Sequence, residues 1–251
     1  MPKSLIHVVW FKRDLRFTDH EPLCRALASD IPVLLIYCFE PSLIAFPDSD
    51  VRHWRFVHES LVEMQGRLED RNGQLYVFHS EAIPVFQALA SVYDIKTLFS
   101  HEEIGNALSY QRDKEVAEFC KMAGISWNET PTGGVIRRLK SRKIWQQRWE
   151  RTMNSTPFFV PENDWNLLPL EPTFYDACKG PELPLSFKAR NPIFQEGGEY
   201  WGWKYLKSFI ETRHTDYSFS ISKPEASRRG CSRISPYLAY GNISMRMAHT
   251  F

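Results

Sequence analysis

The chain has 251 residues, of which 43% are hydrophobic and 14% aromatic, so it has ample material for a buried core and is not expected to be disordered. Its 31 basic and 30 acidic residues leave a net charge of +1, so the overall charge favours neither a nucleic-acid nor a membrane partner, and any basic surface must be local. Five widely spaced cysteines without a C-x-x-C pair argue against a disulfide framework or a zinc site and favour a reducing cytoplasm.

Short apolar runs rich in β-branched and aromatic residues predict β-strands in the first half of the chain. None of these runs approaches the ~18 residues of a membrane span, and the start of the chain lacks the apolar run of a signal peptide. The predicted strands cover residues 6–11, 32–39, 74–79, 96–100 and, more weakly, 125–128.

Helical patterns lie between these strands, over residues 21–28, 54–68, 83–92 and 106–122. Asn72-Gly73 is expected to stop the second of these helices, and Gly124 the fourth. The alternation of strands and helices implies right-handed crossovers. It therefore predicts an α/β fold with a five-stranded parallel, doubly wound, Rossmann-like sheet over residues 1–130. The strand at 32–39, rich in Val, Ile and Leu, is expected at its centre.

The first predicted strand runs directly into the charged stretch "KRDLRFTD" at residues 12–19. In open parallel sheets, ligands bind beyond the carboxyl ends of the strands. Two interpretations are therefore open. Arg13, Asp14, Arg16 and Asp19 form ion pairs with one another that fix the loop, or they border a ligand site. The sequence favours the ion pairs.

Residues 131–196 are predicted to be a long interdomain linker, because seven prolines crowd residues 157–192 and no strand of normal length lies among them. Within this linker, residues 137–151 carry seven basic residues and one acid. A helix is predicted there with Trp145, Trp149 and Met153 on one face. Its basic residues could contact DNA phosphates, but the apolar stripe favours a helix that packs on its own protein, with both indoles turned inward.

From residue 197 the pattern becomes helical, with Trp201, Tyr205 and Phe209 on one face of the first helix. Ser235 followed by Pro236 predicts another helix with Ser235 as its N-cap. A Ser244 cap is expected to start the last helix. Residues 197–251 are interpreted as the beginning of an all-α domain, and the chain as a fragment or truncation.

Three stretches in order along the chain match the motifs of one family. The first, "VVWFKRDLRFTDHEPL", resembles W-F-R-x-D-L-R-x-x-D-x-x-x-L, with Lys12 where arginine is common. "QEGGEYWGWKYLKSFI" resembles a G-G-E segment, and "GCSRISPYLAYGNIS" resembles T-S-x-L-S-P-Y-L-x-x-G-x-I-S, with Cys231 in place of threonine. Together they resemble the photolyase/cryptochrome family of deoxyribodipyrimidine photolyase-like proteins. The resemblance implies an α/β domain at 1–130, a linker at 131–196 and an incomplete helical FAD-binding domain at 197–251.

The resemblance also implies a cofactor site for FAD. A helix start preceded by small polar residues offers backbone N–H groups to a pyrophosphate, and the implied FAD-binding residues are Tyr217, Cys231, Ser232, Arg233, Ile234 and Ser235. Residues 101–113 resemble the part of the family that faces an accessory light-harvesting pigment of unknown identity. A solvated helix start with Glu102 and Glu103 near the helix dipole explains this segment equally well. No catalytic residue is identified, and no histidine has metal-ligand spacing.

Three functions follow from the resemblance. The first is light-dependent repair of pyrimidine dimers by electron transfer from reduced FAD, with damaged DNA as the partner of the full-length protein. The second is blue-light reception of the cryptochrome type without repair. The third is a non-catalytic nucleotide- or pigment-binding α/β module, which the early end of the chain favours for this chain alone. The fragment alone is expected to be inactive and to carry no stoichiometric FAD, and its oligomeric state is left open.

Overall fold

The structure is a computed structural model that describes residues 2–137, 139–162 and 165–251. Its centre is a sheet of five parallel strands in the order β3-β2-β1-β4-β5, so the predicted five-stranded parallel sheet is confirmed. All of β2 is buried and it is an interior strand, although β1 occupies the middle position. The strands are β1 (Ser4–Phe11), β2 (Val33–Cys38), β3 (Leu75–Phe78), β4 (Tyr93–His101) and β5 (Ser126–Thr130).

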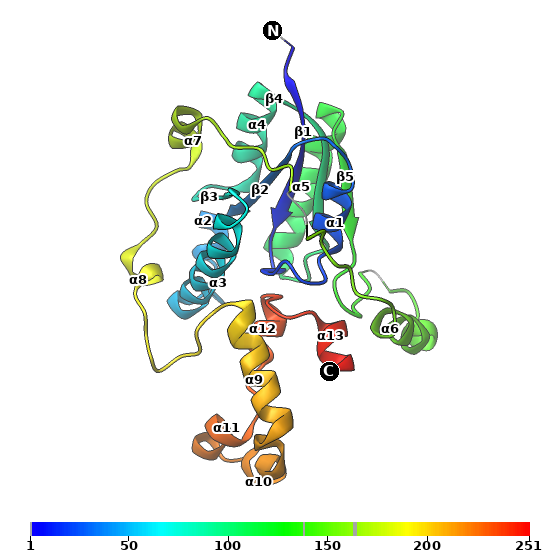
Figure 1. The fold of residues 1–251 in the computed structure, drawn as a ribbon, viewed down its shortest axis with the longest axis vertical. Helices are drawn as coiled ribbons and strands as arrows, with labels where there is room; N and C mark the ends of the chain where they lie inside the picture. Colours follow the sequence, from blue (N-terminus) through cyan, green and yellow to red (C-terminus); the bar gives the residue numbers. More distant parts are fainter. Residues whose placement is uncertain (1, 138, 163–164) are drawn as a thin grey trace.

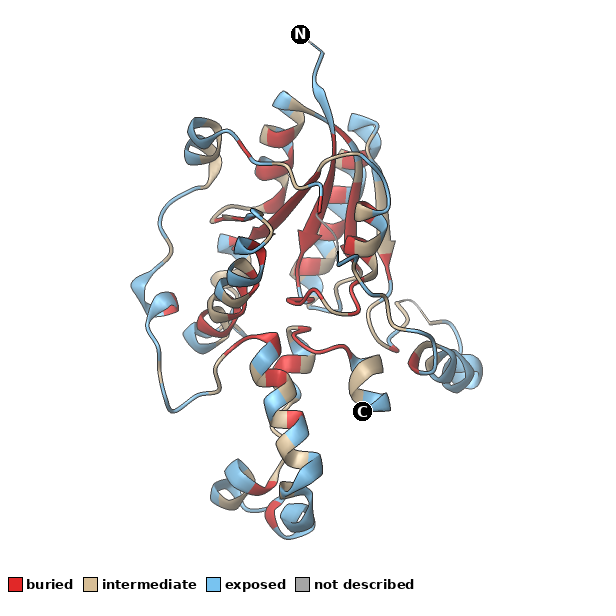
Figure 2. Ribbon diagram, viewed as in Figure 1, coloured by how far each residue is buried: buried red, intermediate tan, exposed pale blue. Residues whose placement is uncertain are grey.

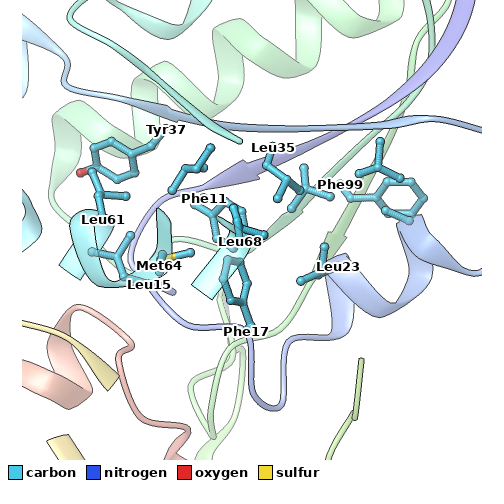
Figure 3. Close-up of a cluster of buried hydrophobic side chains, with 14 of the residues drawn as sticks. Phe11, Leu15, Phe17, Leu23, Leu35, Tyr37, Leu61, Met64, Leu68 and Phe99 are labelled. Atoms are coloured by element: carbon cyan, nitrogen blue, oxygen red, sulfur yellow. The ribbon is translucent and has the colours of Figure 1, made fainter. Parts of the chain in front are cut away.

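Helices cover both faces of this sheet (Figure 1). Helices α1 (Glu21–Leu27) and α3 (Val51–Glu69) pack on one face, and α4 (Ala82–Val92) and α5 (Ala107–Ala123) pack on the other. Each face has its own cluster of buried side chains, and Figure 3 shows part of the first. Burial of each large aliphatic or aromatic side chain contributes about 1.5–3 kcal/mol. The first cluster includes Phe11, Leu15, Phe17, Leu23, Leu35, Tyr37, Leu61, Met64, Leu68 and Phe99.

Capping side chains set the ends of the two longest helices. Helix α3 begins earlier than predicted because the Asp50 carboxylate accepts a hydrogen bond from the N–H of Arg52 at 2.9 Å. Asn106 caps α5 by accepting from the N–H of Ser109 at 3.0 Å. Helix α5 ends at Gly124, whose φ of 71° is left-handed, so the predicted stop is confirmed.

The helix predicted over residues 137–151 is wrong in its first part. Helix α6 covers Trp145–Met153 and follows a 3-10 turn at Arg142–Ile144, while Arg138 lies outside the described residues. Arg137 lies in a turn, where ion pairs tie it to carboxylates at the end of the sheet. These tertiary contacts outweigh the local helical pattern.

The apolar stripe of α6 does face the protein. Met153 is fully buried, and the Trp149 ring lies 5.0 Å from the ring of His249. The indole N–H of Trp145 donates to the carbonyl of Gly134 at 3.2 Å, although 41% of Trp145 stays exposed. Neither indole is fully exposed, so packing explains this stripe better than DNA contact.

After α6 the linker returns across the sheet and down its other side (Figure 1). The backbone of Val33, at the start of β2, bonds to Asn166 at 2.8 Å and to Leu168 at 2.9 Å. Trp165 and Leu170 are buried against the two core clusters. The short helices along this edge are α2 (Pro41–Ile44), α7 (Pro172–Cys178) and α8 (Leu185–Lys188).

The C-terminal segment is helical and far more exposed than the sheet domain (Figure 2). Its first helix begins beside α3, where the carboxylate of Glu59 accepts from the N–H of Gly197 at 2.8 Å and that of Glu63 from Tyr200 at 3.1 Å. These carboxylates favour a helix N-terminus. None of the described helices is long and apolar enough to cross a membrane. The helices are α9 (Glu199–Glu211), α10 (Tyr217–Ser220), α11 (Pro224–Gly230), α12 (Ser235–Ala239) and α13 (Met245–Thr250).

Candidate functional site

The charged β1–α1 loop (residues 12–20) lies at the carboxyl edge of the sheet, facing α12 and α13 (Figure 1). The expected ion pairs among its own side chains are wrong. Arg13 pairs with Glu103 at 3.4 Å. Arg16 uses its guanidinium on the carbonyls of Thr18 at 2.9 Å, Asp19 at 2.8 Å and Gly241 at 2.9 Å. These side chains do not pair with one another because backbone groups of the loop and residues from distant segments satisfy them.

Asp19 joins this loop to the last helix of the chain. Its carboxylate accepts hydrogen bonds from the hydroxyl of Ser244 and from the guanidinium of Arg246 at 2.5 and 3.1 Å. It also accepts from the backbone N–H of Phe158 at 2.8 Å. Ser244 in turn accepts from the N–H of Met247 at 3.3 Å, so its predicted role as the N-cap of α13 is confirmed.

Backbone contacts complete this junction. The N–H of Leu15 donates to the carbonyl of Tyr240 at 3.1 Å, and the buried Asn242 amide donates to the carbonyl of Leu15 at 3.0 Å. Gly241 has a left-handed φ of 68°, and a Cβ there would lie 2.3 Å from the carbonyl oxygen of Arg13. The junction therefore requires glycine at this position.

Asp14 forms a buried cluster with two histidines. Its Oδ2 atom lies 2.9 Å from His20 Nε2 and 2.8 Å from His101 Nδ1, and its Oδ1 accepts from the N–H of Lys12 at 2.6 Å. The three side chains have the proximity of metal ligands. However, His20 Nδ1 accepts the N–H of Leu23 at 3.1 Å, so its proton must sit on Nε2, where a metal would have to bind. The cluster is therefore assigned to hydrogen bonds and not to a metal.

A crevice opens between the ends of β1, β2 and β4, where the strand order reverses. This is the position at which doubly wound sheets bind ligands. Arg112 crosses the crevice and contacts Glu40 at 2.7 Å, Glu103 at 2.5 Å and Asp113 at 2.8 Å, and its guanidinium lies 4.7 Å from the ring centre of Trp10. The lining includes Trp10, Phe11, Lys12, Arg13, Tyr37, Cys38, Glu40, Phe46, His53, Trp54, Glu103, Asn106, Arg112 and Tyr240.

The free volume of this crevice is smaller than that of a typical small-molecule site. Its free volume is about 100 Å³, whereas small-molecule sites are typically about 300–1,000 Å³. The Arg112 ion pairs with Glu40, Glu103 and Asp113 lie across this crevice. The pigment assignment for residues 101–113 therefore stays a prediction. The solvated helix start is wrong, because the side chain of Glu103 is buried in ion pairs with Arg13 and Arg112 and α5 begins only at Ala107.

The ion pairs of this crevice give a testable pH dependence. Burial outweighs the attraction of Arg112 and raises the pKa of Glu40 to about 7. The folded state then keeps a proton that the unfolded state has lost, so the free energy of unfolding falls as pH rises from about 4.5 to about 7. Glu40→Gln removes this proton. We expect the free energy of unfolding of the wild type, minus that of the variant, to fall by roughly 3 kcal/mol between pH 5 and pH 8. Urea unfolding at both pH values measures this difference.

The control for this prediction is Glu81→Gln, because Glu81 lies at the same edge but its carboxylate bonds to Ser42 near the surface. Its stability is expected to follow the wild type at both pH values. Parallel pH profiles for Glu40→Gln and the wild type would contradict the argument.

The residues implied as an FAD site lie in and beside the turn between α11 and α12. Gly230 packs against Ser220, and a Cβ there would lie 2.2 Å from the Ser220 hydroxyl. The turn therefore contacts α10, the short helix that begins with Tyr217. The Tyr217 ring is partly exposed and packs 5.8 Å from the ring of Phe209. The structure does not gather the implied residues at one point: Tyr217 lies beside Phe209 near the end of α9, whereas Ser235 begins α12, whose Tyr237 packs against Gly202 near the start of α9 (Figure 1).

Arg213 organises this turn, and the sequence did not single it out. Its guanidinium donates to the carbonyls of Cys231 and Ser232, and to that of Tyr205 at 2.6 Å. Arg213 thus holds the carbonyls of Cys231 and Ser232. The N–H groups of residues 232–235 have no hydrogen-bond acceptor among the described residues. Arg233 has a left-handed φ of 59°. A left-handed residue followed by a helical one forms a concave row of N–H groups that suits an anion.

Two details of the expected site are corrected. Ser235 is the first residue of α12 and not its N-cap, because the carbonyl of Ile234 already accepts from the N–H of Leu238 at 3.0 Å. The N–H of Cys231 is bonded to the carbonyl of Ser227 at 3.2 Å, so the expected backbone contact from Cys231 is not available. Residues 232–235 fit the phosphates of a dinucleotide, while the described cavities offer no enclosed pocket for its rings beside this turn.

The sequence matches the family model described as DNA photolyase over residues 7–140, just over half of the chain. It is 28% identical to Cryptochrome-1 of Sinapis alba, with 95% of this chain and 50% of that protein covered. It is 24% identical to deoxyribodipyrimidine photo-lyase of Synechococcus sp., with 95% and 52% covered. The chain thus spans about half the length of the curated relatives it matches.

Solved structures show the same fold. The archaeal photolyase of Sulfolobus tokodaii, described with two FAD molecules, matches with a TM-score of 0.69 at 22% identity, covering 97% of this chain and 54% of that one. A cryptochrome of Synechocystis sp. PCC6803 matches with a TM-score of 0.68 at 22% identity, covering 100% and 55%.

Proposed function

Because this chain belongs to the DNA photolyase family, we propose that it functions in the light-driven, FAD-dependent repair of pyrimidine dimers in DNA. The observation that carries the proposal is the concave row of unbonded N–H groups at residues 232–235, which suits the pyrophosphate of a dinucleotide. The resemblance of the chain to a photolyase described with FAD supports the choice of cofactor. When bound, FAD would supply light absorption and electron transfer to the dimer.

In this function, the chain holds and orients the phosphates of the cofactor. Arg213 fixes the turn through the carbonyls of Cys231 and Ser232, so the N–H groups are arranged before any ligand arrives. Arg233 supplies the left-handed residue of the row, while its guanidinium lies 3.4 Å from the carbonyl of Arg228. Tyr217 stays in the proposed FAD site on the strength of the motif resemblance alone. Preorganised donors of this kind lower the entropy cost of binding a charged group.

We expect the purified chain to carry less than one equivalent of FAD. Ligand sites bury about 70–90% of their ligand's surface, and residues 232–235 provide donors for the phosphates without walls for the isoalloxazine and adenine rings. The visible absorption band of flavin, measured against protein concentration, tests this. A resolved flavin band at about one equivalent would contradict it.

Repair itself is tested with a thymine-dimer oligonucleotide in a preparation whose spectrum shows bound, reduced flavin. Loss of the dimer under blue light, with no loss in the dark, is the expected result. Persistence of the dimer under light would contradict the proposal. It would favour the second candidate function, blue-light reception without repair, which the similarity to Cryptochrome-1 supports.

Two further assignments of the chain remain proposals. A flavin-free preparation that still binds a nucleotide would support the non-catalytic binding module. All five cysteines are free thiols, which supports a reducing compartment such as the cytoplasm.

A further inference from the structure

A second and larger cavity lies on the other side of Arg13, between the β1–α1 loop, α6 and α13. Its free volume is about 540 Å³, within the usual range for small-molecule sites. It is separate from the crevice around Arg112 and from the turn at residues 231–235. We call it the His101 cavity. Its lining includes Arg13, Arg16, Asp19, Glu21, His101, Ile104, Thr132, Val135, Arg151, Leu238, Ile243, Ser244, Met245 and Arg246.

His101, a buried residue, brings a nitrogen without a hydrogen-bond partner to the lining of this cavity. It is the last residue of β4 and only 5% exposed. Its Nδ1 bonds to Asp14 Oδ2 at 2.8 Å, and its Nε2 has no hydrogen-bond partner among the described residues. Burial lowers the pKa of His101 to about 3. Although burial alone would raise it, hydrogen bonds from His101 and His20 hold the pKa of Asp14 well below its usual value.

The protonation of this pair fixes what His101 can bind. The ionised Asp14 accepts the single imidazole proton on Nδ1, so Nε2 presents a lone pair toward the cavity. A lone pair on a neutral imidazole accepts a hydrogen bond and does not attract an anion. A ligand must therefore bring a hydroxyl or an N–H group to this position.

The charged side chains that line the cavity also favour an anionic ligand. Four arginines and two carboxylates line the cavity, which leaves +2 with His101 neutral. Arg16 and Arg246 are committed to protein acceptors. Arg151 is exposed and makes no hydrogen bond or ion pair among the described residues. Arg13 makes a 3.4 Å ion pair with Glu103 and lies 5.7 Å from the ring centre of Tyr240, so its N–H groups are less fully used than those of Arg16. A phosphate monoester carries about −1.5 to −2 at pH 7, which matches this excess.

We propose that the His101 cavity binds a phosphorylated small molecule, with its phosphate at Arg13 and Arg151 and a hydroxyl or N–H group donating to His101 Nε2. The apolar lining from Ile104, Val135 and Met245 accommodates the organic body between these two ends. The site requires neither flavin nor DNA, so it stands apart from the light-driven function.

The test is calorimetric titration with adenosine 5′-monophosphate, with adenosine as the ligand that lacks the phosphate. Arg151→Ala is expected to weaken binding of the monophosphate about tenfold, the usual effect of losing a charge-assisted hydrogen bond. The matched control is Arg148→Ala, which removes an equal charge from the same helix outside the cavity and should leave the affinity unchanged.

His101→Asn tests the other end of the ligand. The amide of asparagine can still donate to Asp14 in place of Nδ1, so the buried cluster is kept while the Nε2 acceptor is lost. Its affinity for the monophosphate is expected to fall about threefold to tenfold. Thermal unfolding of the variant shows whether the cluster is intact. In the unsubstituted protein, the ¹⁵N resonance of His101 Nε2 is expected to shift on addition of the monophosphate.

Three results would overturn the proposal. These are no saturable binding at millimolar monophosphate, equal affinity for adenosine, or an equal loss of affinity in Arg148→Ala and Arg151→Ala. Binding at the turn of residues 231–235 is distinguished because it would not respond to His101→Asn or Arg151→Ala. A failure here therefore leaves the proposed flavin function untouched.

Discussion

Asp14→Ala is expected to lower the free energy of unfolding by about 3–5 kcal/mol. The carboxylate is buried and accepts from the N–H of Lys12, from His20 and from His101. Alanine leaves three buried donors without an acceptor, and each unsatisfied group costs about 1–3 kcal/mol. Urea unfolding followed by circular dichroism measures the loss.

Asp14→Asn serves as the comparison. With its amide oxygen in the place of Oδ2, asparagine can still accept from both histidines, while its N–H₂ then faces the N–H of Lys12. We therefore expect a loss between that of alanine and the wild type. A loss under about 1 kcal/mol for alanine would mean that water satisfies the donors and that the cluster is not sealed.

Gly241→Ala is expected to break the contacts between the β1–α1 loop and the residues that join α12 to α13. A Cβ at this position would lie 2.3 Å from the Arg13 carbonyl oxygen and 2.6 Å from the Cα of Asp14. Both are backbone atoms, so no side-chain movement relieves the overlap. The hydrogen bonds from Leu15 to Tyr240 and from Arg16 to Gly241 would be lost together. We expect a loss of about 3 kcal/mol or more in this junction.

Hydrogen exchange read residue by residue is the measurement. Amides of α12 and α13 should lose protection while those of β1 and β4 keep it, because the sheet has its own core. Gly124→Ala is the matched control. It has a similar left-handed φ of 71° but nothing within 4 Å of its Cβ position, so it should cost only about 1 kcal/mol. Equal effects of the two substitutions would show that conformation alone, and not the contact with Arg13, explains the loss.

The sheet could be predicted because its information is local. Each strand is a contiguous apolar run, and Asp50, Asn106 and Gly124 mark helix ends within a few residues of the pattern they limit. The helix expected over residues 137–151 failed for the opposite reason. Arg137 is held by carboxylates from α5, β5 and the end of β4, and no local pattern reports such partners.

The candidate sites divide in the same way. Ser232, Arg233 and Ser235 could be proposed from the sequence because they belong to a contiguous motif. Arg213, which holds the carbonyls of that motif, lies in a different turn. His101 could not be recognised, since its role depends on Asp14, 87 residues earlier in the chain. A signal for Arg213 exists only in retrospect, as a lone arginine shortly before Tyr217.

The contacts between the β1–α1 loop and α13 have a consequence for the order of folding. Asp19 and Arg246 are separated by 227 positions, whereas the strands of the sheet are joined by short crossovers. During synthesis the sheet domain can form while residues 241–246 are still in the ribosome, since domains fold as units from the N-terminus. Until those residues arrive, Arg16 and Asp19 stay hydrated at an open sheet edge. The first loop to be made is therefore among the last parts of the molecule to be buried.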